Sequence, residues 1–211
     1  NIILMGLDLM LGDLDIPPEV SDQLRALKGQ ADRIDKITKN LIAFARSQPH
    51  ELHQIDLNEM VRNTIDLLEQ SLQVQNITVE LRLAEGLPPV SADKDQLQQV
   101  VLSLLTNAQD AMPEGGRLFL STGTVQVGRK LLVEFEVEDT GSGIAPEAIN
   151  TIFDPVVTTK GEGEGTGLGL SICQGIIKAH GGVIWAESEP GQGATFIIHL
   201  PLEQTEERNA E

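Results

Sequence analysis

Several short segments in the second half of the chain carry groups suited to binding a phosphorylated ligand. Asn107 lies four residues after Ser103 in a helix-forming run, so both side chains project from one helix face. An amide oxygen is a hard ligand that suits Mg²⁺. Asp139 follows an alternating strand pattern and precedes a turn with glycines at Gly141 and Gly143. A carboxylate at this place can accept a hydrogen bond from an exocyclic amine, while glycines let a ring approach the backbone.

Two further segments extend this pattern toward phosphate. The run IFDPVVTTK, Ile152 to Lys160, is apolar and ends in two hydroxyls and a cation, and GTGLGL, Gly165 to Leu170, stands directly before a helix. Backbone N–H groups at the positive end of a helix can receive phosphate oxygens. GTGLGL is not a P-loop, because no Gly-Lys-Ser/Thr follows, and a loop precedes it where a dinucleotide fingerprint needs a strand. A fifth segment, GQGATF, precedes the last strand. Taken singly, each segment is compatible with a turn or a cap, and Asn107 alone is better explained as a helix N-cap or a buried core amide.

Composition limits the partners of such a site. The formal net charge of -17 argues against nucleic acid and against an anionic membrane surface. A phosphate ligand would therefore need a cation such as Mg²⁺ or backbone donors. Cys173 is the only cysteine, which excludes an intrachain disulfide and a thiolate metal site and fits a reducing cytosol. The apolar run near Ile2 to Met10 is too short to span a bilayer.

The first part of the chain predicts a helical hairpin. Apolar residues at helical spacing indicate helices over Ile3–Leu14 and from Glu19 to about Arg46, with a turn at the two prolines between them. One hairpin cannot bury its own apolar stripe, so we expect it either to form a four-helix bundle with a second copy or to pack on the following domain. A polar linker is predicted at Ser47–Gln54.

The rest of the chain alternates helix and strand patterns. We expect helices at Leu57–Leu72, Lys94–Met112, Pro146–Ile152 and Gly167–His180, and strands at Ile77–Leu83, Arg117–Val127, Lys130–Glu138, Gly182–Glu187 and Ala194–Leu200. The predicted class is α+β, a helical hairpin followed by an α/β sandwich with a mixed, largely antiparallel sheet and helices on one face. The predicted domains are 1–50 for the hairpin, 51–205 for the sandwich and 206–211 for a charged tail.

In their order and spacing the five segments resemble the N, G1, F and G2 boxes and the closing glycine turn of the GHKL nucleotide-binding superfamily. The resemblance is strongest to the catalytic domain of two-component sensor histidine kinases. RIDKITKNLIAFAR, Arg33 to Arg46, resembles the second helix of that family's dimerisation and phosphotransfer domain, so the resemblance covers about Asn1 to Leu202. It implies a Bergerat-type fold in which a loop between two boxes closes as a lid over ATP.

The resemblance also implies residue roles. Asn107 would bind Mg²⁺ bridging the ATP phosphates, Asp139 would bond the adenine amino group, and Lys160 would approach the phosphates, so that Asn107 and Lys160 are the candidate catalytic residues. The remaining implied nucleotide-binding positions are Gly141, Gly143, Ile144, Thr158, Gly165, Thr166, Gly167, Leu168, Gly169, Leu170 and Thr195.

The implied activity is that of an ATP-dependent protein-histidine kinase core. It would act as a cytoplasmic homodimer, in a parent protein that is free or membrane-anchored, and would connect an upstream sensor region with a response-regulator receiver domain; no nucleic-acid partner is expected. The family's phosphoacceptor histidine would lie upstream of Asn1, so we expect that this chain alone does not autophosphorylate. His50, His53, His180 and His199 do not match its position.

One position departs from the kinase pattern. Ser103 stands where these kinases usually have Asn and where the ATP-hydrolysing members have a Glu that activates water. A serine hydroxyl cannot act as that base unaided at neutral pH. A GHKL ATPase or an anti-sigma-type serine kinase remains the alternative enzyme, and a dimerising, non-catalytic nucleotide-binding module is the alternative without activity.

Overall fold

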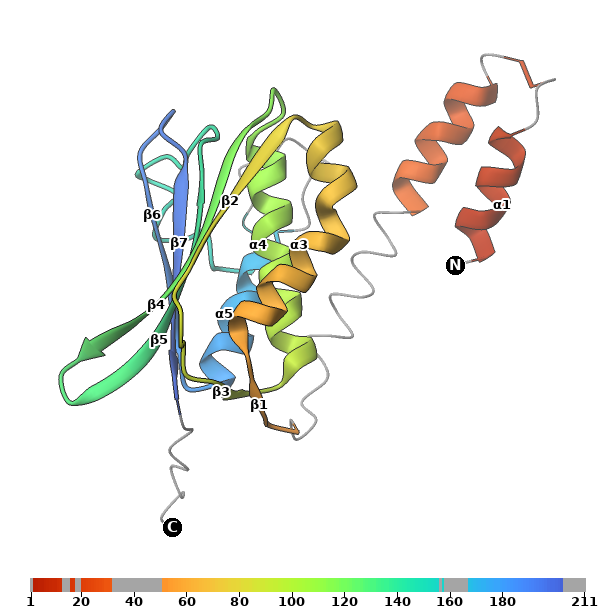
Figure 1. Ribbon diagram of the computed structural model, residues 1–211. Helices are drawn as coiled ribbons and strands as arrows, with labels where there is room; N and C mark the ends of the chain where they lie inside the picture. Colours follow the sequence, from red (N-terminus) through yellow and green to blue (C-terminus); the bar gives the residue numbers. More distant parts are fainter. Residues whose placement is uncertain are drawn as a thin grey trace, which may run out of the picture.

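The N-terminal part contains two helical segments. The computed structural model describes residues 2–12, 16–17, 20–31, 51–155, 157 and 167–202. Helix α1, Ile2–Leu11, and a helical segment at residues 20–31 lie side by side (Figure 1), as the predicted hairpin requires. Apolar side chains of α1 are open to solvent, and Leu9 is 73% exposed. The predicted continuation of the second helix to Arg46 lies outside the described residues.

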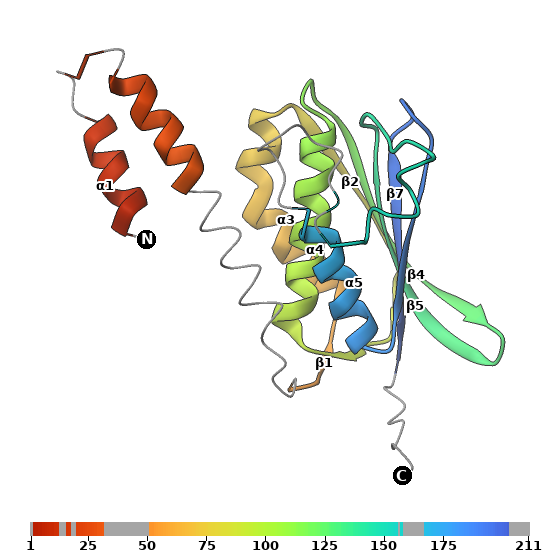
Figure 2. The same cartoon turned by 180° about the vertical axis from the view of Figure 1, so that it is seen from behind.

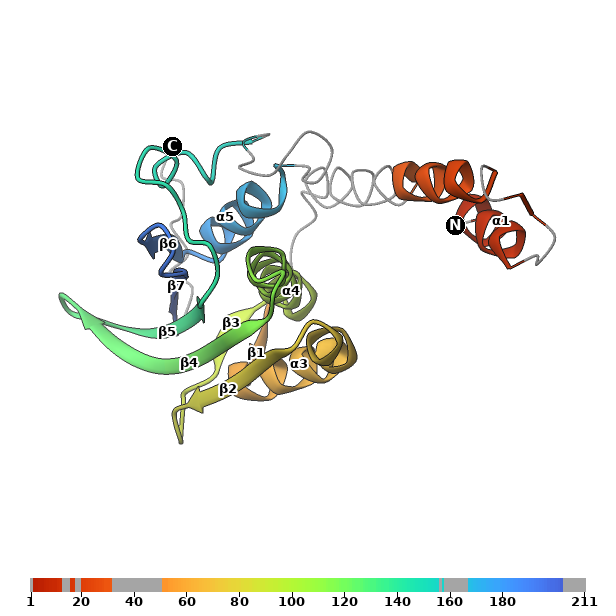
Figure 3. The ribbon, with the colours of Figure 1, turned by 90° about the horizontal axis from the view of Figure 1, so that it is seen from above.

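A sheet covered on one face by helices forms the larger part of the molecule. Its strands are β2 (Ile77–Leu83), β4 (Gly116–Val127), β5 (Lys130–Asp139), β6 (Val183–Ser188) and β7 (Ala194–Pro201), and its helices are α3 (Leu57–Val74), α4 (Lys94–Ala111) and α5 (Gly169–Ala179). The strand order is β2-β4-β5-β7-β6, with β2 and β4 parallel and the other pairs antiparallel. Seen from behind, α5 lies beside α4 (Figure 2). Figure 3 shows the three helices on the same face of the sheet, so the predicted mixed α/β sandwich is confirmed.

A second, two-stranded sheet was not predicted. Strand β1, His53–Ile55, pairs antiparallel with β3, Val90–Ala92. The predicted linker was therefore wrong at His53 and Gln54, which belong to β1. Three residues are too few to show the alternation by which a strand is found in a sequence.

Side-chain caps set where the two long helices begin. Asp56 caps α3 by accepting a hydrogen bond from Glu59 N at 3.0 Å, and Asp93 caps α4 by accepting one from Gln96 N at 3.1 Å. Each bond satisfies an N–H group that has no partner within its helix. The chain turns out of α3 at Asn76, whose φ of 56° lies in the left-handed region that Asn tolerates.

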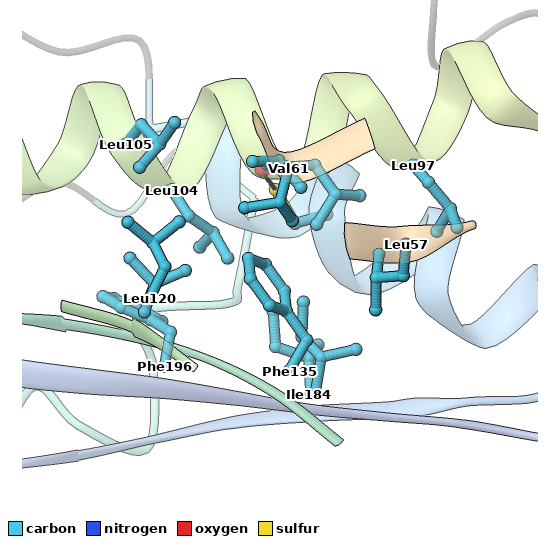
Figure 4. Packing of buried hydrophobic residues seen from close by; sticks show 14 of the residues in the cluster. Leu57, Val61, Leu97, Leu104, Leu105, Leu120, Phe135, Ile184 and Phe196 are labelled. Carbon is cyan, nitrogen blue, oxygen red and sulfur yellow. Dashed lines mark hydrogen bonds between the residues drawn. The ribbon is translucent and has the colours of Figure 1, made fainter. Parts of the chain in front are cut away.

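The core lies between the sheet and its helices. Val133, Phe135 and Val137 alternate along β5 and are all buried, as predicted from their spacing. Phe135 packs among helix residues such as Leu104 and strand residues such as Phe196 (Figure 4). Because α4 is packed along this core, its outer positions are held in fixed places relative to the sheet.

The short helix predicted at Pro146–Ile152 is a series of turns instead. Ile149 N bonds to the Ala145 carbonyl as in an α-helix, at 3.2 Å. Ala148 N bonds to that same carbonyl at 2.9 Å, and Thr151 N bonds to Ala148 O at 2.8 Å, both in the tighter three-residue pattern. The Thr151 hydroxyl also donates to Ala148 O, at 3.1 Å. This side-chain bond competes with a regular helix and favours a turn.

Candidate functional site

One face of α4 lies against two of the predicted segments, the turn after Asp139 and the start of α5. Ser103, Asn107 and Ala111 follow one another at four-residue intervals and so share this face. A Cβ on Gly169, at the start of α5, would lie 3.0 Å from Ser103 Oγ, and a Cβ on Gly141 would lie 2.5 Å from the Ala111 carbonyl oxygen. The half-buried Asn107 therefore lies between the start of α5 and the turn that follows β5.

Asp139 is the last residue of β5 and is only 4% exposed. Its Oδ1 accepts a hydrogen bond from Gly141 N at 2.8 Å. Burial raises the pKa of this carboxyl above its usual range, although hydrogen bonds from the backbone of Gly141 and Ala194 act in the opposite direction; the nearby charge of Glu138 raises it further. The carboxyl is thus a hydrogen-bond acceptor shielded from water, as recognition of an amine requires.

Glycines around Asp139 are required by the packing of the chain itself. Gly143 has a φ of 69°, and a Cβ there would collide with the Glu189 carbonyl oxygen. Gly193 has a φ of 85°, and a Cβ there would collide with the Asp139 carbonyl oxygen. The turn after β5 is therefore packed against the turn between β6 and β7. Close approach of a ligand ring to these glycines stays a prediction.

Ser188 joins the same two turns, and no sequence pattern had indicated this role. Its hydroxyl accepts a hydrogen bond from Ile144 N at 2.8 Å and donates one to the Gly193 carbonyl at 2.6 Å. Ser142 adds a backbone bond, because its carbonyl accepts from Gly191 N at 2.8 Å. These bonds hold the predicted site residue Ile144 beside Gly193, in the turn between β6 and β7.

Thr195 is not brought together with Asp139. The strand register places Ala194 opposite Asp139 and Thr195 opposite Glu138 and Glu187. Side chains alternate between the two faces of a strand, and the next residue, Phe196, is buried in the core. Ala194, rather than Thr195, therefore lies on the face of the sheet that carries Asp139.

The start of α5 has the features of an anion-binding helix end. Gly167 has a φ of 63°, and the N-cap residue Leu168 makes no side-chain capping bond to the helix. Gly169 and Leu170 are the first helical residues, and both are half-buried. Backbone N–H groups in the first turn of a helix favour negative charge. The predicted residues Thr158, Lys160, Gly165 and Thr166 lie outside the described residues.

Metal binding at this site would depend on few protein groups. Within the described residues, no group of three or more His, Cys, Asp or Glu side chains is placed to hold a metal ion. The amide of Asn107 is compatible with Mg²⁺ when phosphate oxygens complete the coordination.

Among the described residues, no helix combines the length and the apolar character that crossing a bilayer demands.

Comparison with known proteins agrees with this geometry. Residues 92–204 match the family described as histidine kinase-, DNA gyrase B-, and HSP90-like ATPase. The chain belongs to this family. The match includes α4, Asp139, the glycine turns and α5, so every described residue of the candidate site lies in the family domain.

Within the family, sensor kinases are among the similar proteins. The sensor kinase CckA of Brucella abortus (strain 2308) is 38% identical over an alignment of 210 residues, and the match covers 94% of this chain and 22% of CckA. Full-length ShkA, solved in complex with AMPPNP, is 28% identical with a TM-score of 0.76, covering 96% of this chain and 43% of ShkA. Histidine kinase ThkA, solved with the response regulator protein TrrA, is 27% identical with a TM-score of 0.71, covering 95% and 57%. The chain thus spans about a fifth of CckA.

Proposed function

We propose that this chain is the ATP-binding and dimerisation core of a sensor histidine kinase. In the intact protein it would transfer the γ-phosphoryl group of Mg-ATP to a histidine upstream of Asn1, for relay to an aspartate of a response regulator. The proposal is carried by one observation: within a domain of this family, the α4 face of Ser103, Asn107 and Ala111 spans from the start of α5 to the turn after Asp139. The bound AMPPNP of ShkA and the regulator bound to ThkA support it.

Each end of this site suits one part of ATP. Asp139 is a buried acceptor for the adenine amino group. The first turn of α5 offers backbone donors to the phosphates, since Leu168 supplies no capping side chain. Asn107, between them, would hold Mg²⁺, which supplies charge neutralisation at the transferred phosphoryl group. Lys160, Thr158, Gly165 and Thr166 are proposed to complete the phosphate side.

The alternative enzymes and the non-catalytic module are less well supported. Ser103 Oγ is packed against Gly169 and also hydrogen-bonds the Cys173 thiol, whose pKa burial raises to about 11. Among the described residues, the neighbours that the structure gives this hydroxyl are Gly169 and a protonated thiol, and neither acts as a base at neutral pH. The sensor kinases among the relatives favour phosphotransfer over hydrolysis.

The hairpin is proposed to form a homodimer. Ile3, Met5, Leu9 and Met10 are all more than half exposed on α1. A second copy would bury these side chains in a four-helix bundle. We propose domain limits of 1–50 for this hairpin, 51–205 for the catalytic domain and 206–211 for a charged tail.

Phosphorylation of the intact parent protein tests the function. The protein is incubated with Mg-ATP, and its phosphate is tested for acid lability and base stability, the signature of phosphohistidine. Asn107→Ala, which removes the proposed Mg²⁺ ligand, is the control and should be labelled more slowly. Label of this kind supports the kinase. Release of phosphate without a labelled protein would instead identify an ATPase, and nucleotide binding without turnover would identify a binding module.

A further inference from the structure

His180 is buried where the far ends of α4 and α5 meet. It follows the last residue of α5 and is 1% exposed. Its Nδ1 lies 2.8 Å from the Ile176 carbonyl oxygen, and its Nε2 accepts a hydrogen bond from Asp93 N at 3.0 Å. A carbonyl only accepts and a backbone N–H only donates, so the ring is the neutral tautomer that carries its proton on Nδ1.

This arrangement ties two helices together. The Nδ1 bond stays within the end of α5, whereas the Nε2 bond reaches the N-cap residue of α4. Asp93 in turn follows β3, which pairs with β1. The Nε2 bond thus joins the end of α5 to the point where the small sheet meets α4.

The opposite end of the same helix pair is the phosphate side of the proposed site. There, a Cβ on Gly169 would meet Ser103 Oγ at 3.0 Å. Between the two ends, Cys173 Sγ lies 4.0 Å from the Val100 carbonyl oxygen. With a rise of about 1.5 Å per residue, His180 lies about 16 Å along the axis from Gly169. A tilt of α5 released at His180 would therefore displace its first turn.

We propose that His180 is a positioning residue for nucleotide binding, which it serves by fixing α5 against α4 through the Asp93 N–H bond. The inference rests on the proposed function, because it concerns the phosphate-binding end of the same site. Without the bond, a smaller fraction of molecules holds the first turn of α5 in place, and the apparent affinity for phosphates falls by that fraction.

Two substitutions separate the inter-helix bond from the bond within α5. In His180→Asn, the shorter side chain keeps an amide donor near the position of Nδ1 and loses the acceptor for Asp93 N–H. In His180→Gln, the longer side chain places its carbonyl near the position of Nε2 and retains that acceptor. Both variants replace the ring with an amide, so each is the control for the other.

The measurement is the dissociation constant of a non-hydrolysable Mg-ATP analogue and of adenosine, with both variants fully folded. We expect His180→Asn to weaken the analogue about two- to twelve-fold, the range that one net hydrogen bond contributes, and to leave adenosine unchanged. His180→Gln should restore the wild-type value. Equal affinities for Asn and Gln, or equal weakening of both ligands, would overturn the positioning role. Wild-type protein that binds neither ligand would overturn the proposed function instead.

The bond can also be removed from the side of α4, which keeps the test open if His180→Asn does not fold. Asp93 has a φ of -82°, which proline can adopt. Asp93→Pro removes the N–H together with the Asp side chain, whereas Asp93→Ala removes the side chain beyond Cβ and keeps the N–H. Weaker analogue binding by Asp93→Pro than by Asp93→Ala supports the positioning role of this hydrogen bond, and equal binding contradicts it.

Discussion

Replacing Asp139 by Asn should weaken nucleotide binding without lowering the stability of the protein at pH 7. Asn has the same shape and keeps an oxygen for the hydrogen bond from Gly141 N, 2.8 Å away, but carries no charge. The carboxyl is 4% exposed, and burial raises its pKa above the ordinary value of 3.8. The folded state therefore binds this proton more tightly than the unfolded state, and the ionised carboxyl lowers stability at neutral pH.

The sign of the pH dependence follows from this shift. The free energy of unfolding of the wild type should fall as the pH rises from 3.8 through the raised pKa of Asp139, and Asp139→Asn should lack this fall. At pH 7 the variant should be at least as stable as the wild type. Urea denaturation across this pH range measures the difference. Glu138→Gln is the charge-matched control, because its side chain lies on the opposite face of β5.

Nucleotide binding should change in the opposite direction. A hydrogen bond to a charged group contributes about 1.5–3 kcal/mol, so its loss should raise the dissociation constant of ATP about 10- to 150-fold. Calorimetric titration with a non-hydrolysable analogue measures this, and Glu138→Gln should bind almost normally. Unchanged affinity in Asp139→Asn would remove Asp139 from the adenine site. A large loss of stability at pH 7 would refute the argument from burial.

Four further changes test other parts of the molecule. Phe135→Ala should cost about 3–5 kcal/mol of unfolding free energy in urea denaturation, because the side chain is 2% exposed. Gly193→Ala should destabilise the protein more than Gly191→Ala in the same assay: both positions have a positive φ, but only a Cβ at Gly193 meets the backbone of Asp139. Asn107→Ala should weaken the Mg²⁺-bound analogue about tenfold, a loss of about 1.4 kcal/mol, with little effect in EDTA. Leu9→Glu should shift the proposed dimer toward monomer in sedimentation velocity, since Leu9 is 73% exposed on α1.

Elements in which the hydrophobic pattern repeats over many residues could be predicted from the sequence. Helix α4 was expected at Lys94–Met112 and is found at Lys94–Ala111, because eighteen residues repeat the apolar spacing many times. The alternation along β5 was equally clear. Strands β1 and β3 contain three residues each, and their pairing depends on a contact between segments far apart in the chain. No local pattern shows such a contact.

The segments of the candidate site could be proposed from the sequence, but the contacts between those segments could not. Asp139 and the glycine turn were found from residue type, but their contacts with Glu189, Ser188 and Gly193 follow from tertiary packing. Thr195 was expected to support the adenine side, whereas the register of β5 with β7 pairs Asp139 with Ala194. A shift of one residue changes the face of a strand, and register is not visible in one strand alone.

The register at the ends of β5 and β7 has a consequence for dynamics. Asp139 and Ala194 are direct partners, so the end of β5 and the start of β7 lie at a single rung of the ladder. Residues 141–155, which follow that rung, pair with none of these strands and can therefore rearrange without breaking the ladder of β4, β5 and β7. Opening this segment has its own local free energy, separate from that of global unfolding. Amide exchange should thus be faster in residues 141–155 than in the central strands, so the turn beside Asp139 can open while the sheet stays intact.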